Sequence, residues 1–130
     1  MEEVYNFIKN ANTYFLATVD KDKPKVRPFG SINIFEDKLY IETSKLKEVS
    51  KQIENNPNVE LCALSDGKWL RLSGTLVRDE RIEAKISMFE NNPILKKFYK
   101  VDSDKTEVLY FKNATAIIYS FTEEIKKIDF

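Results

Sequence analysis

Hydrophobic residues recur every three or four positions in three parts of the chain, a spacing that places them on one face of a helix. The positions that share a face are Val4, Phe7, Ile8 and Ala11, then Leu46, Val49 and Ile53, and finally Ile82, Ile86 and Phe89. The sequence Asn-Asn-Pro follows the second segment at 55–57 and the third at 91–93, and it predicts the end of each helix. Asp79 is the expected N-cap of the third helix. A further short turn is expected through Leu95 and Phe98.

Six other segments contain the β-branched and aromatic runs that predict strands. They cover residues 13–19, 25–35, 38–43, 58–64, 68–78 and 107–121. The first three strands follow one another without a helix, and Glu36 and Asp37 close a predicted hairpin between the second and third. Gly74 interrupts the fifth strand and predicts a bulge or bend. The expected order is α-β-β-β-α-β-β-α-β.

Hairpin-linked strands with inserted helices favour a mainly β, α+β fold. The most economical form is an antiparallel barrel of about six strands with flanking helices, because closure hides strand edges. A doubly wound nucleotide-binding fold is disfavoured, since it needs alternating strands and helices and a glycine-rich turn after the first strand. The sequence contains no such glycine motif. Its 130 residues predict one domain, residues 1–130.

Charge and composition narrow the function. The 21 basic and 21 acidic residues give zero net charge, which disfavours nucleic acid and anionic membranes as partners. There is no histidine and only one cysteine, Cys62, so histidine-dependent nucleophile systems, imidazole-bound metals and multi-thiolate sites are excluded. We expect any catalysis to come from a bound cofactor. The acidic N-terminus lacks a signal-peptide pattern, which predicts a cytoplasmic protein.

The strand over residues 25–35 carries a candidate binding surface. Alternation places Val26 and Pro28 on the expected core face, and Arg27 and Phe29 on the opposite face. A solvated face seldom needs a phenylalanine beside an arginine. The alternative is an edge strand with Arg27 in solvent and Phe29 packed on a neighbour.

A second candidate lies where the strand ending at Thr43 meets the next helix. Thr43 or Ser44 is expected to cap that helix. Lysines around a helix start oppose the helix dipole, so Lys45, Lys47 and Lys51 are unfavourable there unless an anion binds. A phosphate would remove the conflict. The alternative is a capped helix whose lysines lie in solvent.

A third candidate is Trp69, the only tryptophan. It shares a strand face with Arg71, opposite a face of leucines. A half-exposed tryptophan is often an interface anchor or a stacking surface for a ring. It could otherwise cover the mouth of the barrel.

These motifs, in this order, resemble the pyridoxamine 5'-phosphate oxidase-like proteins, which are FMN-binding split β-barrels. The segments that carry the resemblance are Tyr14-Phe15-Leu16-Ala17-Thr18-Val19, Lys25-Val26-Arg27-Pro28-Phe29-Gly30, Leu39-Tyr40-Ile41-Glu42-Thr43, Asn56-Pro57-Asn58-Val59 and Ser73-Gly74. The similarity runs in order from about Thr13 to Glu80.

The resemblance implies a homodimer with FMN sites at the subunit interface. By the match, Arg27, Ser44 and Lys47 hold the phosphate, while the strand with Pro28 and Phe29 lies along the flavin ring. The match also places Thr43 against the flavin, and Trp69 and Arg71 on a strand that can contribute to the site. Residues 91–104 are a candidate flap over the ring.

The resemblance further implies an oxidoreductase that uses a reduced nicotinamide donor and an unidentified acceptor. Leu46 and Glu48 flank Lys47 where the family has a denser basic cluster, and the missing histidine argues against true pyridoxamine phosphate oxidase activity. Two alternatives stay open. The barrel could be a non-catalytic flavin store, electron carrier or small-ligand module, or it could bind the deazaflavin F420.

Overall fold

The computed structural model describes all residues, 1–130. Helix α1 (Glu2–Ala11) precedes a hairpin of β1 (Tyr14–Asp20) and β2 (Lys23–Phe29), and then β3 (Asn33–Phe35) and β4 (Lys38–Ser44). Helix α2 (Glu48–Asn55) leads into β5 (Asn58–Ser65) and β6 (Lys68–Asp79). Helix α3 (Ile82–Asn91), the short 3₁₀ helix η1 (Pro93–Lys97), β7 (Thr106–Tyr119) and β8 (Lys126–Asp129) complete the chain. The three predicted helices and the order of the six main strand segments are confirmed. Two details of the predicted helix faces are wrong: Leu46 lies before α2 and is exposed, and α3 buries Ala84, Met88 and Phe89 while Ile82 and Ile86 are exposed.

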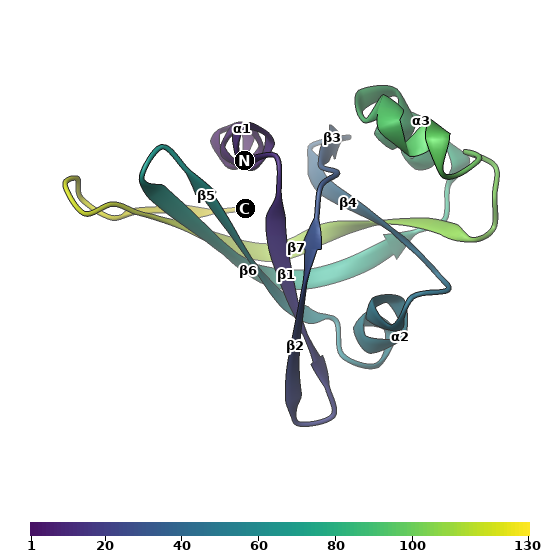
Figure 1. The fold of residues 1–130 in the computed structure, drawn as a ribbon, viewed down its shortest axis with the longest axis horizontal. Helices are drawn as coiled ribbons and strands as arrows, with labels where there is room; N and C mark the ends of the chain where they lie inside the picture. Colours follow the sequence, from purple (N-terminus) through teal and green to yellow (C-terminus); the bar gives the residue numbers. More distant parts are fainter.

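The strands form one antiparallel sheet in the order β2-β1-β5-β6-β7-β4-β3, with β8 paired to β7. The long central strands curl the sheet so that its two ends approach each other, and helices flank it (Figure 1). β2 and β3 follow one another in sequence but lie at opposite ends of the strand order. This is the antiparallel α+β, mostly β, arrangement that the pattern predicts and the split barrel that the family resemblance implies.

The expected strand over residues 25–35 is therefore two strands, and this changes which side chains face inward. Val26 is 66% exposed, whereas Arg27 and Phe29 are half-buried on the inner side. The predicted core face of this segment is wrong for Val26 and Pro28. The inner position suits Arg27 because the carbonyl of Leu16 accepts a hydrogen bond from its guanidinium. The break at residues 30–32 resets the alternation, so Ile32 still enters the core.

Both predicted helix caps are wrong. Helix α2 begins after Lys47, because β4 continues through Ser44, which pairs with Thr106 of β7. The Ser44 hydroxyl instead accepts a hydrogen bond from the amide of Leu46. Helix α3 begins after Arg81, because Asp79 is the last residue of β6 and pairs with Val108.

The main core lies inside the curled sheet and is closed by α1 and α2, from which Val4, Ile8, Val49 and Ile53 contribute. A smaller cluster lies outside β4, where Tyr40 and Val108 pack against Met88 and Phe89 of α3. The register between β6 and β7 shifts beside Gly74, which confirms the predicted bulge. None of the helices has the length and apolar character needed to cross a membrane.

Candidate functional site

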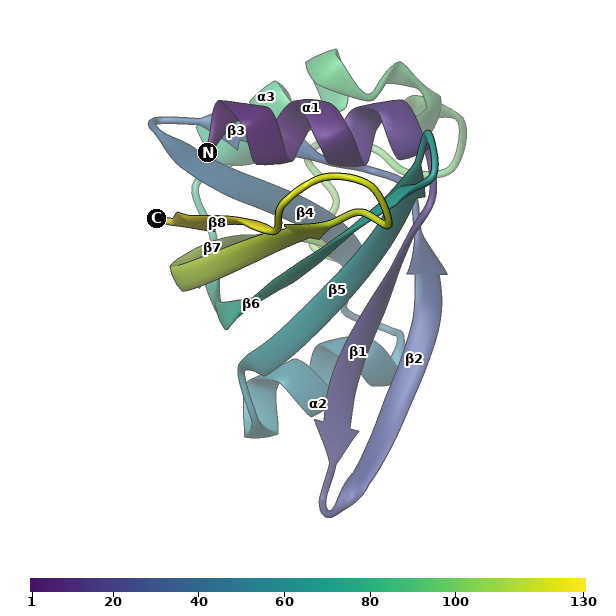
Figure 2. The ribbon, with the colours of Figure 1, turned by 90° about the vertical axis from the view of Figure 1, so that its left-hand side faces the viewer.

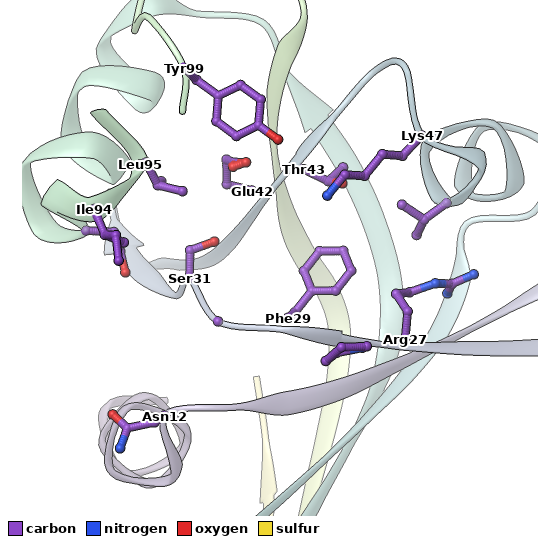
Figure 3. Close-up of a pocket in the computed structure, with 14 residues that line it drawn as sticks. Asn12, Arg27, Phe29, Ser31, Glu42, Thr43, Lys47, Ile94, Leu95 and Tyr99 are labelled. Carbon is purple, nitrogen blue, oxygen red and sulfur yellow. The ribbon is translucent and has the colours of Figure 1, made fainter. Parts of the chain in front are cut away.

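A cavity of about 510 Å³ opens where the two ends of the sheet meet without pairing. Its walls come from the end of β2, the connector to β3, the end of β4, the start of α2, and η1 with Tyr99 just beyond it (Figure 3). This volume is in the range of sites for small ligands and cofactors. The curled sheet thus brings residues as far apart in the chain as Asn12 and Tyr99 to one site.

Two cations, Arg27 and Lys47, lie at one end of the cavity. Arg27 donates hydrogen bonds to the Thr18 hydroxyl at 2.8 Å and to the Gln52 side-chain oxygen at 2.8 Å, and burial lowers the pKa of its guanidinium. Lys47 extends from the start of α2 toward the cavity (Figure 3). A positive end beside a helix start is suited to an anion such as phosphate.

Phe29 and Ser31 also line the cavity. The Phe29 ring packs against the buried ring of Tyr14, with 5.8 Å between centroids. The Tyr14 hydroxyl donates a hydrogen bond of 2.6 Å to the Ser31 carbonyl, and burial raises the pKa of this hydroxyl well above its usual value. Tyr14 therefore fixes both Phe29 and the connector that follows it.

The opposite wall consists of η1 and the residues around it. Ile94, Leu95 and Tyr99 line the cavity there, so part of the predicted flap segment contributes a wall. Asn92 donates hydrogen bonds from its amide nitrogen to the carbonyls of Ile32 (3.0 Å) and Met88 (3.1 Å). The second Asn-Asn-Pro sequence thus ends α3 and also fastens η1 to the connector.

Two buried side-chain oxygens in the cavity wall have no hydrogen-bond partner, Oε2 of Glu42 and Oγ1 of Thr43. Glu42 is only 6% exposed. Burial raises its pKa to about 7, which the charge of Lys47 opposes and that of Glu107 reinforces. In the sequence, Glu42 stands out only as part of the family motif Leu39-Tyr40-Ile41-Glu42-Thr43. The available signal was a lone acid within the apolar run of β4.

The predicted site residues separate into two groups. Arg27, Pro28, Phe29, Thr43 and Lys47 line the cavity. Ser44 is buried beside it and bonds to its own loop.

Trp69 and Arg71 lie elsewhere, on the outer face of the sheet. Trp69 stacks on Tyr119, with centroids 5.3 Å apart and ring planes 8° apart. Arg71 forms an ion pair with Glu60, at 2.7 Å between Nη2 and Oε2. Neither residue lines the cavity of its own chain, so a role for them in a ligand site stays a prediction that requires a second subunit.

The residues of the cavity fit FMN. Arg27 and Lys47 match a phosphate, and Phe29, Leu95 and Tyr99 offer apolar surface to a flat ring. The unpartnered oxygens of Glu42 and Thr43 are available for the polar atoms of such a ring, because buried polar groups normally have partners.

Comparisons with known proteins agree with the fold. The family model for pyridoxamine 5'-phosphate oxidase matches residues 1–115. A NimC/NimA family protein from Clostridium acetobutylicum is 37% identical, with a TM-score of 0.97 over 100% of this chain and 92% of that chain. No curated protein matches the chain.

Two more distant structures share the fold. General Stress Protein 26 from Bacillus anthracis str. Sterne is 22% identical, with a TM-score of 0.74 over 98% of this chain and 97% of that chain. A heme binding protein from Mycobacterium smegmatis is 13% identical, with a TM-score of 0.78 over 98% of this chain and 57% of that chain. At these identities the likeness concerns the fold alone, so the ligand must be argued from the cavity.

Proposed function

The chain belongs to the pyridoxamine 5'-phosphate oxidase family, and we propose on that premise that it binds FMN in the cavity between β2 and β4 and acts as an oxidoreductase. The observation that carries the proposal is that Arg27 and Lys47 lie together at one end of the cavity. The other walls present aromatic and aliphatic side chains and two buried oxygens that have no hydrogen-bond partner. The phosphate would then contact the cationic end of the cavity, and the flat ring would contact its aromatic and aliphatic walls.

Each element has a defined part in this proposal. Arg27 and Lys47 would bind the phosphate, and Gln52 and Thr18 hold the Arg27 guanidinium in place. Phe29 would pack on the ring, with Tyr14 behind it. Bound FMN would supply the redox chemistry, by accepting a hydride from a reduced nicotinamide donor and passing the electrons to an acceptor. The chain's own contribution is binding, orientation and exclusion of water.

The substrate is proposed to differ from pyridoxamine phosphate. The cavity has two cationic side chains, Arg27 and Lys47, and the phosphate of FMN would engage both. A second phosphate ester bound at the same time would lack a cationic partner, and the sequence has no histidine to provide one. We therefore propose that the compound oxidised is not pyridoxamine phosphate, whose phosphate lies one carbon from the ring that would enter the cavity.

We further propose a homodimer formed through the outer face of the sheet. No helix lies over β1 and β5 on this side (Figure 2). Cross-strand neighbours form a row of Leu64, Trp69 and Tyr119, next to which lie Phe15 and Arg71. Leu64 is 65% exposed and Phe15 45%. Large contiguous apolar surface of this kind is typical of interfaces, and a symmetric pair would also bury Trp69.

Purification without added flavin tests the cofactor. We expect a yellow protein that absorbs in the flavin region, and extracted cofactor that co-elutes with FMN in chromatography. Extracted cofactor that co-elutes with F420 would identify the deazaflavin alternative. Reduction of the bound flavin without turnover in the presence of candidate acceptors would identify the electron-carrier alternative. A colourless protein that does not bind added FMN would contradict the proposal.

A further inference from the structure

Glu42 is an acidic residue in a buried position that destabilises its ionised form. It lies near the end of β4 in a run of buried residues from Leu39 to Ser44, and it lines the cavity. Its Oε2 atom is buried and has no hydrogen-bond partner. A carboxylate without partners in such a site is strongly destabilised, whereas a neutral carboxyl is tolerated more easily. A neutral carboxyl also carries one O–H donor.

The charged and titratable groups around Glu42 do not neutralise it through contact. Lys47 at the start of α2 favours the charged form, but no ion pair joins the two side chains, and Glu107 of β7 opposes that form. Arg27 of β2 is engaged with Thr18 and Gln52. The hydroxyl of Tyr14 on β1 is occupied by the Ser31 carbonyl, and Tyr99 lines the same cavity.

We propose that Glu42 recognises the ligand by donating a hydrogen bond from its protonated carboxyl to an acceptor atom on a flat heterocycle bound in the cavity. The inference rests on the proposed function, since it assumes that a flavin binds there. Figure 3 shows Glu42 beside Tyr99 and Thr43, away from the Arg27 end, so it faces the part of the cavity left for a ring. The two carbonyl oxygens and the unprotonated ring nitrogens N1 and N5 of a flavin are such acceptors.

This role has a consequence for pH. Glu42 is neutral below about pH 7 and ionised above it. A ligand that accepts its proton in a hydrogen bond favours the neutral form, so binding raises the pKa further and affinity falls as pH rises through 7. Riboflavin is the informative probe because it has the ring but no phosphate, whose own titration would overlap.

The test is a fluorescence titration of riboflavin and of FMN between pH 5.5 and 8.5, with wild type, Glu42→Gln, Glu42→Leu and Glu48→Gln. Wild type should bind riboflavin about two- to ten-fold more weakly at pH 8.5 than at pH 5.5, as expected for one hydrogen bond. Glu42→Gln keeps an N–H donor and should bind without this pH dependence. Glu42→Leu should bind weakly throughout. Glu48→Gln removes an exposed acid at the start of α2 and should behave as wild type.

A measurement on the wild type alone removes any dependence on how the variants fold. In protein labelled with carbon-13 at glutamate carboxyls, one resonance should change its chemical shift with a titration midpoint near pH 7. That midpoint should move to higher pH when riboflavin is added. The same pH dependence in Glu42→Gln as in wild type would overturn the inference while leaving flavin binding intact. Affinity that rises with pH would also overturn it, because an ionised Glu42 would then be the acceptor. Failure of every protein to bind either flavin would overturn the proposed function, and this inference with it.

Discussion

The Nη2 atom of Arg27 donates a hydrogen bond to Oε1 of Gln52 over 2.8 Å, and this contact joins β2 to α2 across the interior of the sheet. The Thr18 hydroxyl donates to the same Gln52 oxygen at 2.6 Å. One buried amide oxygen on α2 thus fixes the direction of the guanidinium that lines the cationic end of the cavity. The proposed phosphate site depends on a residue that does not itself line the cavity.

Replacing Gln52 by leucine removes this shared acceptor. We expect the free energy of unfolding to fall by roughly 1–3 kcal/mol, because the buried Thr18 hydroxyl and one guanidinium nitrogen of Arg27 each lose an acceptor. We also expect FMN affinity to fall about three- to ten-fold while riboflavin affinity changes little, since Arg27 is proposed to act on the phosphate. Gln52→Glu keeps an acceptor and should retain more FMN affinity than Gln52→Leu. Equal losses for both flavins would show that Arg27 acts elsewhere.

Lys47 and Lys51 offer a matched pair for locating the phosphate. Both belong to the α2 region, but Lys47 lines the cavity, whereas Lys51 is exposed and lies 3.6 Å from Glu48. Lys47→Glu should weaken FMN binding about ten- to hundred-fold, which corresponds to loss of one charge-assisted bond. Lys51→Glu should have a small effect. Isothermal titration of the apoprotein measures both, and equal small losses would contradict the phosphate placement.

The outer face of the sheet predicts the behaviour of a charged substitution. Leu64→Asp places a carboxylate in the middle of the proposed interface, and we expect it to shift the protein from dimer to monomer in analytical ultracentrifugation. Ile82 is 42% exposed on α3, away from this face, so Ile82→Asp is the control and should remain dimeric. A wild-type protein that sediments as a monomer would rule out the proposed interface.

Asp79 makes stability depend on pH in the acidic range. Its carboxylate accepts hydrogen bonds from the Tyr40 hydroxyl at 2.7 Å and from Arg81, chiefly through the guanidinium, and Arg81 lowers the pKa of Asp79 to about 2. The folded state therefore prefers the charged form more than the unfolded state does. This stabilisation is complete above the unfolded pKa, near 4, and is lost as pH falls toward 2.

Urea unfolding between pH 2 and 6 tests this assignment. Asp79→Asn should lower the free energy of unfolding by roughly 1–3 kcal/mol at pH 6 and flatten the acid dependence. Asp66, which is exposed in the turn between β5 and β6, provides the control Asp66→Asn. If the free energy of unfolding of Asp79→Asn falls with decreasing pH as steeply as that of wild type, another carboxyl is responsible for the acid dependence.

The sequence pattern predicts most of the fold but misses features that depend on pairing. β8 carries the sequence Lys-Lys-Ile-Asp, which has no alternating apolar pattern, and it forms because Lys126 and Lys127 pair with the exposed edge of β7. The Ser44 cap fails for a related reason, since pairing with Thr106 keeps Ser44 in a strand. Local preference was outweighed in both cases by a ladder with a distant segment.

The candidate site was predictable where a motif carries its chemistry. Strand alternation, helix-start charge and family resemblance point to Arg27, Phe29 and Lys47, and all three line the same cavity. None of these signals points to Glu42. Its side-chain oxygen is buried and unpartnered in a cavity that Leu95 and Tyr99 also line, and local sequence does not encode that long-range arrangement.

The unpaired seam between β2 and β4 has a consequence for ligand exchange. The three residues from Gly30 to Ile32 connect the two ends of the sheet covalently, but no backbone ladder spans the gap in which the cavity lies. A molecule can therefore enter or leave without separating any strands. Its residence time would be governed by side-chain motion at the rim, and amide protection along β5 and β6 would persist through repeated loading and release.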